Sequence, residues 1–323
     1  MRNAVKLICA AACAAIAMVA RPVEASGYPD RPIKLIVPTV PGTVPDVLSR
    51  LIGDRLASVL GQPLVIENRP GAIGTIGLNA VAKALPNGYT LGVLTVPYII
   101  APRLLAQVPY DTERDLAPVT LVAWNYTLLA VPIASSVRSV ADLVNLAKVK
   151  PGELKFSSPG YATPPHLAGE LFARAAGINL AHIPYKGAAA STTALATGEV
   201  DMGFASPGVI AQYVKAGKLR TLATAAPRRL AAYPDLPTLR ELGYAVEISD
   251  WQGIVVPAGT PKDVIATLHA AITKVIVAED FRQRLDTLGM EVGGIGPAEY
   301  AAHIHNEIQR WGKLVRDAGI KAD

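Results

Sequence analysis

Short apolar runs alternate with amphipathic segments along the chain, and this alternation is the feature that most limits the possible folds. In the first third, residues 33–37, 64–66 and 89–95 have the length and apolar character of buried strands. Between them, residues 46–60 and 75–85 carry apolar side chains at helical spacing. Strands separated by helices of this length predict a mainly parallel sheet that is doubly wound, with helices on both faces.

The same series occurs a second time. Its strands are predicted at 154–157, 180–183, 201–205 and 219–223, and its helices at 165–176, 189–197 and 207–216. The C-terminal part is mostly helical, with helices expected at 261–277, 279–288 and 297–318 and one strand at 253–256. One strand is too few for a separate domain, so this part is expected to complete the first one.

This organisation predicts two α/β lobes. Lobe 1 is expected to comprise residues 26–125 together with 252–323, and lobe 2 residues 126–251. The crossings between the lobes are expected near 126–131 and 248–256.

The first 25 residues have the three parts of a secretory signal peptide. Arg2 and Lys6 form a basic start, residues 7–20 are apolar, and Ala25 ends the segment with a small side chain. The apolar run is shorter than the roughly 20 residues that span a bilayer. The segment therefore predicts export to the periplasm as a soluble protein. The alternative is that it forms an N-terminal helix of the folded chain.

The amino-acid composition excludes several classes of binding site. Hydrophobic residues make up 51% of the chain and charged residues 18%, which predicts a well-packed globular protein. Both cysteines, Cys9 and Cys13, lie inside the predicted signal peptide, so the mature chain is expected to have no disulfide and no cysteine-ligated metal. The formal charge is +5. Because the sequence has no cluster of Lys and Arg residues, that charge does not indicate nucleic-acid binding.

Enzyme signatures are weak. No serine lies in a G-x-S-x-G elbow, and His303 and His305 are spaced to point to different sides of a helix rather than to one metal. The glycine-rich segment 71–77 has the spacing G-x-x-G-x-x-G, which differs from the dinucleotide-binding pattern. We therefore expect neither catalysis, nor a bound metal, nor a cofactor.

Each series carries a glycine-containing loop between its first strand and the helix that follows. These loops span 38–46 and 157–166. A strand, such a loop and a helix N-terminus present unpaired N–H groups and the positive end of a helix dipole. Two matched loops therefore predict a cleft that receives an anion. We expect the ligand to contact Gly42, Thr43, Val44, Pro97, Ser158, Gly160, Tyr161, Ala162, Thr163, His166, Gly187, Ala188 and Asp201.

Individual residues in this set have different expected roles. Ser158 and Thr163 offer neutral hydroxyls, which bind a carboxylate at little desolvation cost. His166 either donates to the anion or fastens the second loop, and Asp201 either bonds neighbouring backbone or accepts from a ligand hydroxyl or amine. Asp46 would repel an anion, so we predict that it caps its helix.

Several ordered sequence blocks resemble one receptor family. They include Tyr28-Pro29-Asp30-Arg31-Pro32-Ile33, Glu67-Asn68-Arg69-Pro70-Gly71-Ala72, Pro86-Asn87-Gly88-Tyr89-Thr90-Leu91 and Ile183-Pro184-Tyr185-Lys186-Gly187. With the Pro41-Gly42 loop, they make the chain similar to extracytoplasmic solute receptors of the tripartite tricarboxylate transporter system, the TctC-like or Bug receptors. The resemblance implies a two-lobed periplasmic binding protein fold of the type II, Venus-flytrap kind. It also implies a monomer that closes over a small carboxylate and delivers it to membrane permease subunits.

The resemblance further implies that the first loop holds one carboxylate through backbone amides and ordered water. Two positions depart from the family pattern, because Thr43 and Ala162 stand where glycine is usual. Pro97 and Tyr98 replace smaller, more polar residues, which suggests an aromatic or apolar ligand body.

The sequence leaves the ligand open among dicarboxylates, tricarboxylates, acidic amino acids and aromatic carboxylates. The alternative functions are a ligand sensor that signals to a membrane kinase and, less favoured by the motifs, a periplasmic hydrolase.

Overall fold

A computed structural model describes residues 27–318 of the chain. The chain divides into two units, 1–30 and 31–323. The predicted signal peptide, with Cys9 and Cys13, lies outside the described residues. Within 27–318, no helix combines the length and the apolar character that crossing a membrane requires.

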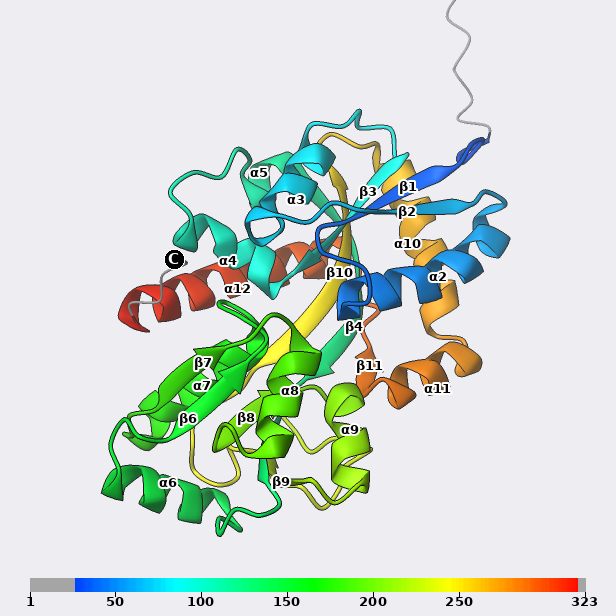
Figure 1. The fold of residues 1–323 in the computed structure, drawn as a ribbon. Helices are drawn as coiled ribbons and strands as arrows, with labels where there is room; N and C mark the ends of the chain where they lie inside the picture. The colour runs from blue at the N-terminus through cyan, green and yellow to red at the C-terminus, as the bar shows by residue number, and fades with distance from the viewer. Residues whose placement is uncertain (1–26, 319–323) are drawn as a thin grey trace, which may run out of the picture. The chain divides into compact units, whose positions relative to one another are not determined.

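The first sheet has six strands in the order β11-β4-β10-β3-β1-β2 (Figure 1). Strand β1 lies parallel to β2 and β3, whereas β10 is antiparallel to β3 and β4, and β11 is antiparallel to β4. The parallel part is the one that the βαβαβ pattern predicts. The strands are β1 (Ile33–Val37), β2 (Leu64–Asn68), β3 (Thr90–Thr95), β4 (Leu116–Tyr126), β10 (Ser249–Pro257) and β11 (Met290–Val292).

The second sheet has five strands in the order β7-β6-β8-β5-β9. Strand β6 lies parallel to β7 and β8, and β5 is antiparallel to β8 and β9. Both sheets thus combine three adjacent parallel strands with antiparallel additions. The strands are β5 (Leu128–Pro132), β6 (Lys155–Ser158), β7 (Ala181–Pro184), β8 (Met202–Ala205) and β9 (Leu219–Thr224).

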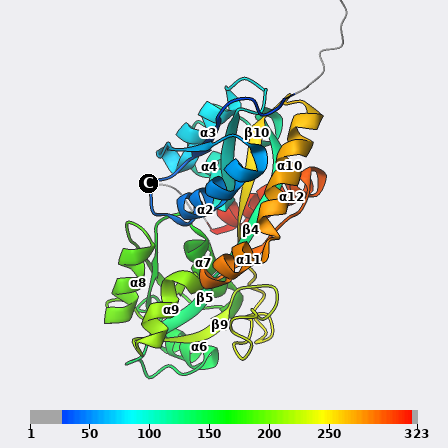
Figure 2. The same ribbon diagram turned by 90° about the vertical axis from the view of Figure 1, so that its right-hand side faces the viewer.

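Helices cover both faces of each sheet, as a doubly wound fold requires (Figures 1 and 2). Around the first sheet, α10 packs on α2, and α12 packs on α4 and β4. Around the second sheet, α7 packs on β6 and β8, and α8 packs on α9 and on β5, β6 and β8. The helices are α2 (Val44–Leu60), the 3₁₀ turn η1 (Ala72–Gly74), α3 (Thr75–Ala82), α4 (Val96–Leu104), α5 (Thr112–Asp115), α6 (Val140–Val149), α7 (Pro164–Ala176), α8 (Ala188–Thr197), α9 (Pro207–Lys215), α10 (Lys262–Ile276), α11 (Glu279–Thr287) and α12 (Pro297–Ala318).

Some elements do not follow from the sequence patterns. Helix α4 begins directly after β3, so no turn signal separates them, and β4 contains Pro118. Proline is tolerated there because β4 has register irregularities against β10 in this region. Helix α6, β11 and most of β4 are also absent from the prediction.

The chain passes between the sheets at two neighbouring points. Strand β4 ends at Tyr126 and β5 begins at Leu128, so Thr127 is the single residue between the first sheet and the second. On the return path, Ala225 N–H donates to the Thr127 carbonyl at 2.9 Å, and Ile248 N–H donates to the Ala225 carbonyl at 2.8 Å. These hydrogen bonds hold the two connections together just before β10 begins.

Candidate functional site

A cavity of about 780 Å³ opens where the loops of both sheets face each other. It lies beside the carboxyl ends of the parallel strands, where ligands bind in open α/β sheets. Among the described residues that line it, Lys186 and Asp250 are the only two from the Asp, Glu, Lys and Arg set. An anion in this cavity would therefore depend mainly on neutral donors.

Helix N-termini supply such donors. The residues that precede the first turns of α2, α3, α4, α7, α8 and α9 all line the cavity; they are Thr43, Gly74, Thr95, Thr163, Gly187 and Ser206. None of these six helices is capped by a side-chain hydrogen bond at that residue. Among the helices that begin elsewhere, α5 and α6 are capped by Asp111 and Ser139, whereas α10 and α11 have no side-chain cap. The six uncapped ends concentrate partial positive charge at one place.

Asp46 stabilises the first loop through hydrogen bonds. Its carboxylate, which is buried, accepts hydrogen bonds from Gly42 N at 2.9 Å, Asn68 Nδ2 at 2.9 Å and Arg50 Nη2 at 2.9 Å. Burial alone would raise the pKa of this carboxyl, but the hydrogen bonds from Arg50, Gly42 and Asn68 outweigh that effect and lower it. Asp46 is absent from the cavity lining. It is not the cap residue that we predicted, because Thr43 holds that position and Asp46 lies inside the first turn of α2. Its bond from Gly42 N instead shapes the loop that presents Gly42, Thr43 and Val44.

Replacing Asp46 by alanine is expected to lower the free energy of unfolding by about 2–3 kcal/mol, because three donors lose a buried charged acceptor. Urea denaturation measures this change. Asp54→Ala is the matched control, since Asp54 lies on the same helix but is exposed. Equal stabilities of the two variants would contradict the role given to Asp46.

The second loop offers fewer donors than its position suggests. Helix α7 begins with Pro164 and Pro165, neither of which carries an N–H. Gly160 N donates to Ser158 Oγ at 3.2 Å, and Ala162 N donates to His166 Nδ1 at 3.1 Å. The Thr163 hydroxyl lines the cavity but donates to the Gly160 carbonyl at 2.7 Å. Much of this loop's hydrogen-bonding capacity therefore closes the loop on itself.

A stack of aromatic rings supports the second loop. The ring centroids of His166 and His182 lie 4.1 Å apart, and that of Phe156 lies 4.7 Å from His182. Tyr161 meets both histidines edge-on. Burial lowers the pKa of His166 to about 3, with the neighbouring His182 adding to the effect, and burial lowers the pKa of His182 to about 4. Both rings are therefore neutral at physiological pH and act as packing and hydrogen-bonding groups.

Helix α8 presents the most open set of amides. Its first residues are Ala188 and Ala189, which carry N–H groups and no competing polar side chain. Gly187 adopts φ of +102°, and a Cβ added there would meet no atom within 4 Å. Gly187, Ala188 and Ala189 all line the cavity.

The structure brings most of the predicted ligand contacts to this cavity. Its lining includes Gly42, Thr43, Val44, Pro97, Gly160, Tyr161, Thr163, Gly187 and Ala188.

Four predicted contacts lie elsewhere. Ser158, Ala162 and His166 belong to the second loop but are buried and do not line the cavity. Ala162 N donates to His166 Nδ1 at 3.1 Å, and Ser158 Oγ bonds His182 Nε2 at 2.6 Å. Asp201 accepts from Lys155 N at 2.8 Å at the start of β6, the opposite end of that strand from the loop. The ligand edge of a parallel sheet lies at the strands' carboxyl ends, so a residue at a strand start is too far away.

Sequence reasoning missed the polar residues at the base of the cavity. Asn125, Thr127, Asp250 and Gln252 line it from the ends of β4 and β10 and from the connection between β4 and β5. Asp250 and Gln252 flank Trp251, and their alternation along a strand was the available signal.

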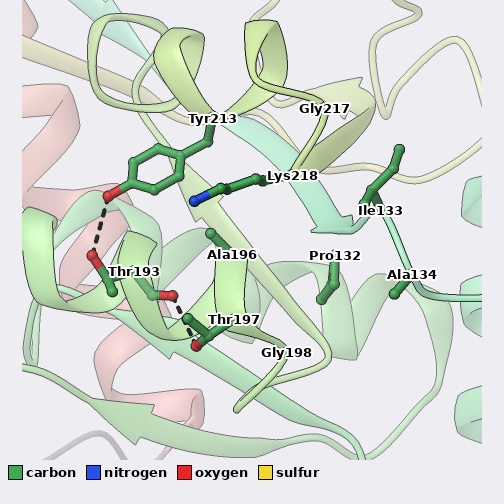
Figure 3. Close-up of a pocket in the computed structure, with 10 residues that line it drawn as sticks. All are labelled: Pro132, Ile133, Ala134, Thr193, Ala196, Thr197, Gly198, Tyr213, Gly217 and Lys218. Atoms are coloured by element: carbon green, nitrogen blue, oxygen red, sulfur yellow. Dashed lines mark hydrogen bonds between the residues drawn. The ribbon is translucent and has the colours of Figure 1, made fainter.

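A smaller pocket of about 270 Å³ lies near the C-terminal ends of α8 and α9 (Figure 3). Its hydroxyl groups are already engaged, because Thr193 Oγ1 bonds Tyr213 OH at 3.1 Å and Thr197 Oγ1 donates to the Thr193 carbonyl. This pocket lacks the converging helix N-termini of the larger cavity.

Comparison with known proteins assigns the chain to a family. Residues 48–320 match the tripartite tricarboxylate transporter family receptor, TctC. The chain belongs to this family. A protein of R. palustris, solved with adipate, is 34% identical with a TM-score of 0.82 over 91% of this receptor and 99% of that chain. Periplasmic binding protein BugD is 29% identical with a TM-score of 0.79 over 92% and 100% of the two chains.

MatC of Rhodopseudomonas palustris, solved with bound malate, is 29% identical with a TM-score of 0.78 over 89% and 99% of the two chains. These similarities confirm the predicted Bug-type receptor and its α/β periplasmic binding protein fold. The family is one of solute-binding receptors rather than catalysts.

Proposed function

We propose that this receptor is exported to the periplasm, binds a small carboxylate in the 780 Å³ cavity and delivers it to permease subunits of a tripartite tricarboxylate transporter. The observation that carries the proposal is the convergence of six uncapped helix N-termini on one cavity. Backbone amides and helix dipoles stabilise an anion without the desolvation cost of burying a counter-charge. The relatives solved with adipate and malate support a carboxylate as the anion.

Binding is proposed to act by closure. The cavity is lined by loops of both sheets, so one ligand contacts both, and the sheets are joined only by the connections at Thr127 and at 225–248 among the described residues. Two lobes, 26–125 with 252–323 and 126–251, would rotate about these connections. A ligand that bonds both lobes at once favours the closed state by its differential affinity for that state. A monomer leaves both lobes free to move.

A carboxylate that binds is expected to raise the melting temperature of ligand-stripped protein by several degrees. At 100 times the Kd, a ligand stabilises the native state by about 2.7 kcal/mol. The measurement is a thermal-shift screen of aliphatic, amino, hydroxy and aromatic carboxylates, followed by calorimetry on each hit. Amines and neutral amides of the same carbon skeletons are the controls. Stabilisation by the neutral amides but by no carboxylate would overturn the proposal.

A further inference from the structure

The base of the cavity offers hydrogen-bond acceptors, whereas the helix N-termini around its rim offer N–H donors. We call Asn125, Thr127, Asp250 and Gln252 the acceptor floor. All four side chains line the cavity, and each residue is less than a tenth exposed. Asp250 pairs with Asn125 across the β10/β4 ladder, and Gln252, two residues along, lies on the same face of β10.

The hydrogen bonds within the floor orient its amides. Gln252 Nε2 donates to Asp250 Oδ2 at 3.4 Å, and the Asn125 side chain also hydrogen-bonds the Asp250 carboxylate. The ionised carboxylate accepts only, so in that state each amide faces it with nitrogen. The amide oxygens are thereby turned away from Asp250.

Three acceptor atoms of the floor are left without a partner. Among the described residues, nothing bonds Asn125 Oδ1, Gln252 Oε1 or the hydroxyl oxygen Thr127 Oγ1. Buried polar atoms in proteins are nearly always hydrogen-bonded, so these atoms indicate a group that arrives from outside the chain. The two amide oxygens accept only, so the group that meets them has to donate, whereas the Thr127 hydroxyl can accept or donate.

The charge of Asp250 also favours a ligand group that donates a hydrogen bond. Asp250 is the only carboxylate among the described residues that line the cavity. Burial raises the pKa of Asp250 to about 7, and the charge of Glu307 on α12 adds to this effect. A buried carboxylate is stabilised by a donor or a cation beside it.

We propose that the acceptor floor binds an O–H or N–H donor of the ligand, so that the receptor prefers hydroxy- or amino-carboxylates to the same acids without a donor. This inference rests on the proposed carboxylate binding at the rim. The ligand then lies with its carboxylate toward the helix N-termini and its donor toward β4 and β10.

The test compares matched probes by calorimetry on ligand-stripped protein. One series is succinate, malate and aspartate, and another is adipate and 2-aminoadipate. In at least one series, a donor-bearing member is expected to bind at least about 10-fold more tightly than its parent. Gln252→Leu is expected to bring that ratio close to one, whereas Gln283→Leu, on the exposed surface of α11, should preserve it.

Asp250→Asn separates the two donor sources. It keeps the shape but removes the charge, so an ammonium should lose far more affinity than a hydroxyl. Melting temperatures of both floor variants show that they fold. Parent acids that bind as tightly as their donor-bearing partners in the wild-type protein would overturn this inference and leave the proposed function standing. Failure of all five acids to bind, while another carboxylate of the thermal-shift screen binds regardless of whether it carries a donor, would likewise overturn this inference and leave the proposed function standing.

Discussion

Replacing Ala188 by proline is expected to weaken carboxylate binding about 10- to 100-fold, the loss for one hydrogen bond to a charged group. Ala188 is the first residue of α8, where proline fits the backbone and removes only the N–H. The preceding residue, Gly187, has ψ of 168°, which is compatible with a following proline. Calorimetry with the best carboxylate from the thermal screen measures the effect.

The matched control is Glu279→Pro. Glu279 is likewise the first residue of its helix, α11, but it lies outside the cavity lining. It should leave affinity unchanged, and both variants should melt within a few degrees of the wild-type protein. Wild-type affinity in the Ala188→Pro protein would remove the α8 amides from the site.

Acidification is expected to destabilise the protein through the stacked histidines beneath the second loop. The pKa values of His166 and His182, about 3 and about 4 in the folded chain, lie below the unfolded value of 6.5. Between the folded and the unfolded pKa values, the unfolded chain therefore binds more protons than the folded chain. The free energy of unfolding that these histidines contribute is fully present above pH 6.5 and is lost as the pH falls. Each histidine contributes a slope of about 1.4 kcal/mol per pH unit.

The double variant His166→Asn and His182→Gln tests this slope. Both replacements keep an acceptor or donor near the original ring nitrogen, but neither titrates. Urea unfolding between pH 7 and pH 4.5 should show a wild-type slope that exceeds the variant's by about 2–3 kcal/mol per pH unit. Asp250, whose raised pKa lowers stability as the pH rises toward 7, is present in both proteins and cancels. Parallel curves would show that the stack does not titrate on unfolding.

The first loop shows how far sequence reasoning reached into the site. Gly42, Thr43 and Val44 were predictable because a strand, a glycine loop and a helix follow one another within a dozen residues, and local order of that kind is visible in the sequence. The same argument found Gly187 and Ala188. It placed Ser158 and His166 in the second loop but did not predict their burial, which depends on the packing of Phe156, Tyr161 and His182.

The acceptor floor lay beyond such reasoning. Asn125 and Asp250 are more than 100 residues apart in the chain, and only the antiparallel pairing of β4 with β10 places them side by side. Strand pairing over such distances depends on the whole packed sheet rather than on any local pattern.

The sequence by itself determined two series of parallel strands and helices, the glycine loops at their carboxyl ends and a family of receptors. These features follow from residue spacing and local turn chemistry, which act over a few residues. Only the tertiary structure decided that six helix N-termini share one cavity, that His166 is buried and accepts a hydrogen bond from Ala162 N, and that unpartnered polar atoms lie at the base. Those facts depend on which distant segments pack together, because burial and hydrogen-bond partners are set by the folded neighbours of each side chain.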